Sequence, residues 1–268
     1  QNNLFSMKNF LLPTLYFLFL TAILSFAISP IALATSKVPV TPPQIERLPE
    51  AEFLPDVNMF RRSHPEKIIF SQIKLAGGEP DFDELAKASP FVHNAQEIDK
   101  SAMIFAEYNR IANNFSMHNE TAPIVVKTRL AVDEYSSLQD MLVFDELDET
   151  AYFEFDYYGH SVGIVPEELS RFQHLALSKP SAERFFRITQ NRRQVVAEFI
   201  LIPSYADSKD PVLIGDKTYW LMAAKVAEFR LWNNDDPETA QLLWYHRAPW
   251  YSPKDDQQID DLFNNTGP

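Results

Sequence analysis

Residues 159–163 read GHSVG and carry the spacing of a catalytic motif. In the pattern G-x-S-x-G, a serine on a sharp turn becomes a nucleophile when a histidine, oriented by an acid, takes its proton. Here the serine is Ser161, and Asp207 or Asp235 followed by His246 would supply the acid and the histidine in the required chain order. One interpretation of the chain is therefore a serine hydrolase that uses Ser161, Asp207 and His246.

The residues around the motif favour a different interpretation. The nucleophile elbow of α/β-hydrolases lies between a buried apolar strand and a helix, and its oxyanion hole uses an HGGG-type segment. In this chain the preceding run alternates with Glu154 and Asp156, residues 164–166 continue as a strand-like IVP, and the whole sequence has only 6 glycines. We therefore expect residues 158–161 to form a hairpin turn with Ser161 at an exposed tip, and we predict no catalytic residue.

The histidines and the acidic runs do not indicate a metal site. No two histidines have the H-x-x-x-H or H-E-x-x-H spacing. The acidic runs at 145–149 and 233–236 lack the alternating Asp residues and central Gly of an EF-hand loop. The sequence therefore predicts neither a metal nor a cofactor. The histidines are His64, His93, His118, His160, His174 and His246.

Aromatic residues gather late in the chain, near Arg247. Exposed rings of this kind stack on sugars or anchor a protein interface, whereas buried ones pin a segment to a sheet. Both interpretations remain open, so these residues are candidates for ligand or interface contacts. They are Trp232, Trp244, Trp250 and Tyr251.

The amino-terminal segment predicts export. Residues 1–6 precede Met7, which we take as the natural start, and a lysine follows before the apolar run at 15–28. Residues 32–34 read ALA, the small-x-small pattern that signal peptidase recognises, and cleavage after Ala34 would leave no stable membrane span. The alternative is an uncleaved anchor in which the same apolar stretch spans a bilayer.

Composition narrows the compartment and the partners. The 268 residues carry a net charge of −13, and 46% of them are hydrophobic, which is enough to build a core. Because an acidic surface repels phosphate backbones, we expect no nucleic-acid partner. The chain has no cysteine, and exported proteins of this size without disulfides are typical of the bacterial periplasm.

Two long runs predict the centre of a sheet. Apolar and polar residues alternate with a period of two over 194–202 and again over 218–232. Both faces of the second run are largely apolar, so we expect a central strand that is antiparallel to the first. One face of the second run should carry Tyr219, Leu221, Ala223, Ala227, Phe229 and Leu231.

A stripe of apolar residues at steps of three and four predicts an amphipathic helix. Asn94, with Glu97 three residues later, resembles a capping box at its start. We expect the helix to cover one face of the sheet, with membrane or partner binding of its aromatic stripe as the alternative. The stripe comprises Ile98, Ala102, Phe105, Tyr108, Ile111 or Ala112, and Phe115.

Shorter patterns predict the remaining elements. A strand at 124–132 is expected to pair with residues 152–158, which would place Lys127 and Arg129 opposite acidic residues. Residues 68–75 fit either a strand or a helix, and residues 137–147 fit a helix or an apolar loop. Helices are expected at 81–88, at 167–177 after Pro166, at 182–190 and at 240–244.

Together these elements predict an α+β fold, a mostly antiparallel sheet covered by an amphipathic helix in a single compact domain. The expected role is that of an exported soluble protein, periplasmic or extracellular, with a non-enzymatic binding, assembly or envelope accessory function and another envelope protein as a candidate partner. The expected organisation is a signal peptide at 1–34, a proline-rich extended lead at 35–60, the globular domain at 61–252 and an acidic, weakly ordered tail at 253–268.

Overall fold

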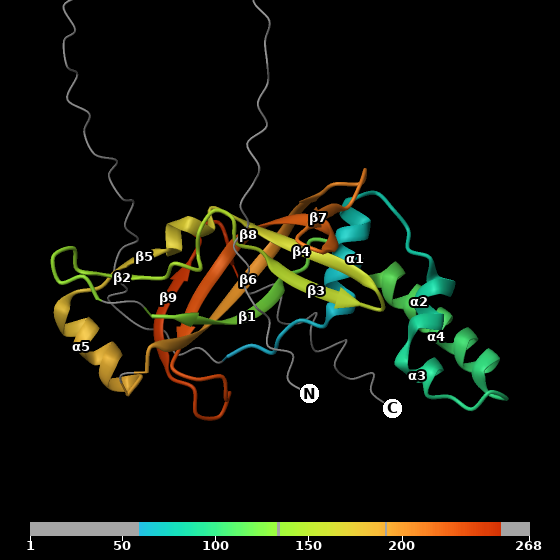
Figure 1. Ribbon diagram of the computed structural model, residues 1–268, viewed down its shortest axis with the longest axis horizontal. Helices are drawn as coiled ribbons and strands as arrows, with labels where there is room; N and C mark the ends of the chain where they lie inside the picture. Colours follow the sequence, from blue (N-terminus) through green and yellow to red (C-terminus); the bar gives the residue numbers. More distant parts are fainter. Residues whose placement is uncertain (1–58, 133–134, 191, 253–268) are drawn as a thin grey trace, which may run out of the picture.

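A computed structural model describes residues 59–132, 135–190 and 192–252, and Figure 1 shows their arrangement. The expected signal peptide, nearly all of the lead and the acidic tail lie outside the described residues. The core of the fold is one large mixed sheet with helices gathered at both of its ends.

The large sheet has seven strands in the order β1-β6-β8-β4-β3, with β7 and β9 also paired to β8. All of its pairings are antiparallel except that of β4 with β8, which is parallel, so the expectation of a mostly antiparallel sheet under one helix was too simple. The strands are β1 (Ile124–Ala131), β3 (Phe153–Tyr157), β4 (His160–Glu167), β6 (Gln194–Ala206), β7 (Val212–Ile214), β8 (Lys217–Trp232) and β9 (Leu242–Arg247).

The predicted centre of the sheet is confirmed. Strands β6 and β8 are antiparallel neighbours, and Phe199 lies opposite Phe229 with both side chains fully buried. Their rings stack with centroids 4.6 Å apart and 6° between planes. The residues predicted to share one face of β8 do so only in part. Ile200 pairs with Glu228 and Leu201 with Val226, so β8 has a bulge that shifts the register. Before the bulge, Met222, Ala224 and Val226 join the core, and after it Phe229 and Leu231 do.

The helices lie at the two ends of the sheet. Helix α1 lies between the sheet and the group α2–α4, and α5 lies at the opposite end beside a small sheet made by β2 and β5 (Figure 1). The bounds are α1 (Pro65–Leu75), α2 (Phe82–Ala88), α3 (Pro90–His93), α4 (Lys100–Met117), α5 (Lys179–Ile188), the 3₁₀ turn η1 (Leu169–Phe172), β2 (Met141–Val143) and β5 (His174–Ala176).

The helix that covers the sheet is α1 and not the predicted one. Residues 68–70 of α1 are buried against the sheet core, whereas α4 packs mainly on α2 and α3. Helix α4 begins after Asp99, so the expected capping box does not form. Only part of the apolar side of α4 is in contact with the rest of the protein, because Ile111 and Phe115 are buried while Phe105 is 69% exposed. Ile98 of the predicted stripe precedes the helix and is 87% exposed.

Other local expectations were met unevenly. The strand at 124–132 is confirmed, but its partner is β6, so Lys127 pairs with Glu198 and not with an acid of β3. The helices expected at 81–88 and 182–190 correspond to α2 and α5. The helix expected at 167–177 is wrong, since Pro166 lies inside β4 and the chain continues through η1 into β5. Residues 240–244 lead into β9 and form no helix.

A cluster of buried charges occupies the other face of β6 and β8. Arg230 is 1% exposed and its guanidinium binds both Glu198 and Glu228, which are fully buried. Lys127 lies 3.4 Å from Glu198, and Arg247 donates to Glu228. Opposite charges therefore nearly balance inside this cluster.

The chain just before α1 closes over this charged cluster. The backbone N–H of Phe60 donates to Glu198 at 2.9 Å, and the Phe60 ring lies 4.3 Å from the Arg230 guanidinium. Ser63 then forms a backbone bond to Val125 of β1, at 3.0 Å. These contacts fasten residues 59–63 along β1 and β6.

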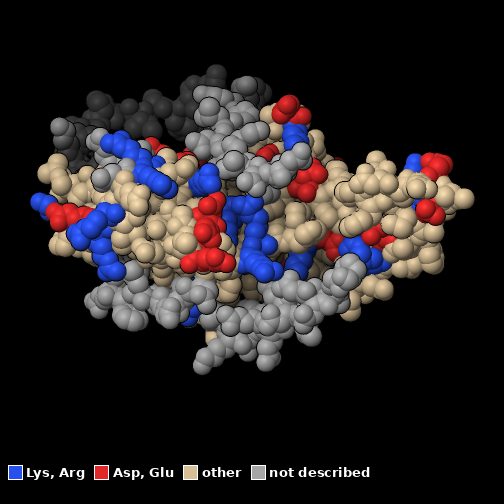
Figure 2. All heavy atoms as spheres, turned by 90° about the horizontal axis from the view of Figure 1, so that it is seen from below, with Lys and Arg blue, Asp and Glu red and all other residues tan. Residues whose placement is uncertain are grey.

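Charges on the molecular surface are mixed. Figure 2 shows Lys and Arg side chains next to bands of Asp and Glu side chains across one face. The net charge is therefore not spread as a uniform acidic field over that face.

Candidate functional site

The structure places the GHSVG motif in a hairpin, as predicted. Strands β3 and β4 are joined by the two-residue turn Tyr158–Gly159, whose φ angles of 53° and 82° suit a tight hairpin. Ser161 is nevertheless not at an exposed tip, because the ladder already begins at the pair Tyr157 and His160. Ser161 is 7% exposed, and its Oγ donates to Asp156 Oδ2 at 2.8 Å.

The structure does not bring the residues of the alternative triad together. Val162, next to Ser161, pairs with Trp220 of β8, while His246 pairs with Phe229 nine residues farther along the same strand. Nine strand residues span about 30 Å. Asp207 follows the last residue of β6 and accepts a hydrogen bond from the Lys209 backbone, and Asp235 forms an ion pair with Arg129. His246 is therefore too far from Ser161 to act as its base, and the Ser161 hydroxyl is bound to Asp156.

The late aromatic residues are also dispersed. Trp232 and Trp244 are buried, Trp232 against Met59 on the charged face and Trp244 against Phe229 in the main core. Trp250 is 55% exposed and meets Tyr251 edge-on at 6.1 Å. The first two rings pin strands to the sheet, and only Trp250 with Tyr251 retains the exposure that an interface would use.

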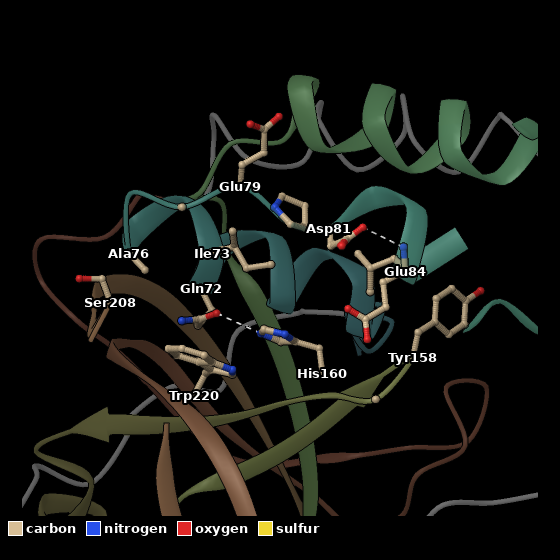
Figure 3. Close-up of a pocket in the computed structure, with 14 residues that line it drawn as sticks. Gln72, Ile73, Ala76, Glu79, Asp81, Glu84, Tyr158, His160, Ser208 and Trp220 are labelled. Atoms are coloured by element: carbon tan, nitrogen blue, oxygen red, sulfur yellow. Dashed lines mark hydrogen bonds between the residues drawn. The ribbon is translucent and has the colours of Figure 1, made fainter. Parts of the chain in front are cut away.

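A pocket lies elsewhere, between α1, the start of α2, the β3–β4 turn and β8 (Figure 3). Its volume is about 370 Å³, within the range of small-molecule sites. Three segments that are far apart in the sequence supply its walls. The lining residues are Gln72, Ile73, Ala76, Gly78, Glu79, Pro80, Asp81, Glu84, Leu85, Tyr158, Gly159, His160, Ser208 and Trp220.

Local turns bring these walls together. Helix α1 stops at Ala76 because Gly77 adopts a φ of +71°, which reverses the chain toward α2. Asp81 then caps α2 by accepting the backbone N–H of Glu84 at 2.9 Å. On the other side, the Tyr158–Gly159 turn places His160 at the first position of β4, beside β8.

Aromatic rings form one wall of the pocket. The His160 imidazole lies parallel to the Trp220 indole, with 2° between planes and 6.0 Å between centroids. His160 Nε2 bonds to Gln72 Oε1 at 3.2 Å, and because an amide oxygen only accepts, this ring nitrogen carries the proton. Burial lowers the pKa of His160, against the opposing charge of Asp156, so the ring is neutral at pH 7.

A buried amide faces the same space. Gln72 is 2% exposed, and its Oε1 accepts the hydrogen bond from His160 Nε2. Its NH₂ group points toward the side of Trp220 and Ser208 in Figure 3 and has no hydrogen-bond partner among the described residues. The amide nitrogen opens onto the pocket, where water or the acceptor of a ligand can satisfy it.

Acidic residues form the remaining wall, where the Glu84 carboxylate points toward the His160 side and the Glu79 carboxylate points away from it (Figure 3). Glu79, Asp81 and Glu84 line the pocket from the α1–α2 connection and the first turn of α2. None of these three carboxylates forms an ion pair within residues 59–132, 135–190 and 192–252, and no Lys or Arg lines the pocket. The wall opposite the rings is therefore acidic.

The sequence analysis did not single out Gln72 or Trp220. It considered His160 as a turn residue and as one of six histidines without the spacing of a metal site. One signal was available, since Gln72 interrupts the otherwise apolar run at 68–75. A polar residue within an apolar run is a candidate for a buried polar site, but its partners could not be named without the fold.

Comparison with known proteins gives no relative for this chain: no family model, no curated protein and no solved structure matches it. Across the three described ranges, no helix combines the length and the apolar character that a bilayer crossing requires. The same ranges contain no group of three or more His, Cys, Asp or Glu side chains that could hold a metal ion.

Proposed function

We propose that this protein is an exported, non-enzymatic binding module that holds a small ligand, or one side chain of a larger partner, in the pocket beside α1. One observation carries the proposal. The NH₂ group of Gln72 lies at the wall of a cavity of about 370 Å³ without a partner in the described chain. A ligand that supplies an acceptor would satisfy this donor and cover the Trp220 indole.

The chemistry of the pocket supports binding over catalysis. His160 Nε2 is bound to an amide and not to a hydroxyl or thiol, so it activates no nucleophile. Ser161 uses its hydroxyl in a bond to Asp156. The serine hydrolase therefore lacks a supporting arrangement, and a binding role explains the pocket with fewer assumptions.

Export is supported by the sequence pattern alone. The lysine after Met7, the apolar run at 15–28 and the ALA at 32–34 together match a cleaved signal peptide. Mass spectrometry of the protein from its native host tests this part of the proposal. A chain that begins at residue 35 is the expected result, and a retained 15–28 segment would contradict it.

The binding role is tested by screening a library of small fragments with ligand-observed NMR. We expect a set of fragments to bind the native protein and to bind the Gln72→Leu variant at least tenfold more weakly. The substitution leaves an apolar side chain of similar size and removes both the NH₂ donor and the oxygen that accepts from His160. The matched control is Gln241→Leu, at an exposed glutamine outside the pocket. Fragments that bind Gln72→Leu as tightly as the native protein, or no binding at all, would refute the proposal.

A further inference from the structure

The pocket has two chemically different ends. At one end are the Gln72 amide, Trp220 and Ser208, and at the other are Asp81, Glu84 and Tyr158, with His160 between them (Figure 3). The first end offers a hydrogen-bond donor from a side chain that is 2% exposed. The second end offers carboxylates, so a ligand that fills the pocket must satisfy both chemistries.

The protein itself neutralises the acidic end only in part, because Lys87 interacts electrostatically with Asp81 and Glu84 but forms its ion pair with Asp83. Lys217 of β8 lies 3.5 Å from Asp156, and neither Asp83 nor Asp156 lines the pocket. His160 adds no positive charge, because burial keeps its ring neutral. The carboxylates that do line the pocket therefore attract a cation from outside.

The aromatic wall suits the same kind of ligand. A guanidinium or ammonium group is attracted to the face of an indole or phenol ring, and Trp220 and Tyr158 both line the cavity. The apolar side chains of Ile73 and Leu85 line it as well, which favours an alkyl stem between the charge and the rest of the ligand.

We propose that the pocket binds a basic amino-acid residue, with its guanidinium or ammonium group at Asp81 and Glu84 and its carbonyl oxygen accepting from the Gln72 amide. This inference rests on the proposed function and names its ligand class. A free amino acid and a residue within a peptide both offer this chemistry, and the experiment below distinguishes these two sources.

The test is calorimetric titration of the folded protein at low ionic strength with N-acetyl-arginine methylamide. Its matched comparison is N-acetyl-citrulline methylamide, which has nearly the same shape without the charge. We expect the arginine compound to bind at least tenfold more tightly. 1-Butylguanidine, which has the guanidinium and an alkyl stem but no carbonyl, should bind at least threefold more weakly than the arginine compound. Equal binding of 1-butylguanidine would contradict the assignment of the Gln72 end.

Variants separate the pocket from the overall charge. Glu84→Gln removes one lining carboxylate and should weaken binding of the arginine compound at least fivefold. Glu183→Gln removes the same charge from α5, at the other end of the molecule, and should leave binding unchanged. An equal loss in both variants would show a nonspecific charge effect and overturn the inference.

The outcomes distinguish this inference from the function beneath it. Neutral or anionic fragments could bind the native protein, bind the Gln72→Leu variant more weakly and fail to compete with any basic compound. In that case the pocket is a binding site, but the assignment of a basic ligand is wrong. Tighter binding of a Gly-Arg-Gly peptide with blocked ends than of free arginine would identify a peptide as the source, and the reverse order would identify the free amino acid.

Discussion

Replacing Arg230 by Met should destabilise the protein strongly, although the side chain does not line the pocket beside α1. The guanidinium is 2% exposed and holds two fully buried carboxylates, those of Glu198 and Glu228. Met fills a similar volume but leaves both carboxylates with fewer positive neighbours. Among the residues that the structure describes, Lys127 remains paired with Glu198 and Arg247 with Glu228. The loss therefore comes from uncompensated buried charge and not from a cavity.

The magnitude follows from the distances. Unit charges 3.1 Å apart, the separation of Arg230 Nη1 and Glu198 Oε1, attract by about 5 kcal/mol at an effective dielectric of about 20. The desolvation of Arg230 itself is relieved in the variant, so we expect a net loss of about 3–5 kcal/mol. With a urea m-value of about 2 kcal/mol/M, the unfolding midpoint should fall by about 1.5–2.5 M.

The loss should also depend on pH. Burial raises the pKa of Glu198, with Arg230 and Lys127 opposing the rise, so removal of Arg230 must raise this pKa further. A carboxyl whose pKa is higher in the folded state contributes its stability below the unfolded pKa, about 4.3 for Glu, and that contribution is lost as pH rises through the folded value. The deficit of the variant should therefore be smallest near pH 4 and grow toward pH 8.

Urea unfolding followed by circular dichroism measures both effects. Arg129→Met serves as the control, because Arg129 and Asp235 form an exposed pair and their loss should cost less than about 1 kcal/mol. Adding Glu198→Gln to Arg230→Met should restore part of the lost stability. A deficit of Arg230→Met below about 1 kcal/mol that does not change with pH would refute the reasoning.

Three further substitutions have defined outcomes. Phe229→Ala removes a fully buried ring and should lower the free energy of unfolding by about 3–5 kcal/mol in urea titrations; an unchanged midpoint would contradict the central position of β8. Ile111→Ala in α4 should cost about 2–5 kcal/mol, whereas Phe105→Ala on the exposed side should stay within about 0.5 kcal/mol, and the reverse order would mean that α4 packs through its other face. Ser161→Ala should cost less than about 1 kcal/mol, and the native protein should resist fluorophosphonate labelling at this serine; stoichiometric labelling would restore the hydrolase.

Sequence reasoning succeeded where one local pattern determined one outcome. Over 194–202 and 218–232, the alternation of apolar and polar residues continues long enough that only a strand would place the apolar residues on one buried face. A strand with two apolar faces requires a central position in the sheet. The same reasoning failed at the bulge in β8, since a single extra residue reverses the faces beyond it without changing the composition of the run.

The errors in the helices have a different origin. The stripe in α4 predicts a helix correctly, but periodicity does not say which part of a wide apolar arc finds a partner. Here α2 and α3 pack on α4, and Ile111 and Phe115 are buried while Phe105 remains exposed. Pro166 suggested a helix start, yet a proline is tolerated in a strand where its missing N–H is not needed by the ladder. The pocket could not be predicted, because Gln72, His160 and Trp220 meet only through tertiary contacts.

The fastening of residues 59–63 determines how the domain would respond to mechanical load. A pull on the chain ahead of Met59 enters the fold through the Phe60 bond to Glu198 and the Ser63 bonds to Val125, at the edge of β1. The first of these bonds ends on Glu198, which is fully buried in the charge cluster, so tension at the amino-terminal side acts directly on a buried ion pair. Residues 59–63 are therefore joined to the sheet in part through its buried ion pairs, on the side where a force applied to the preceding chain would act.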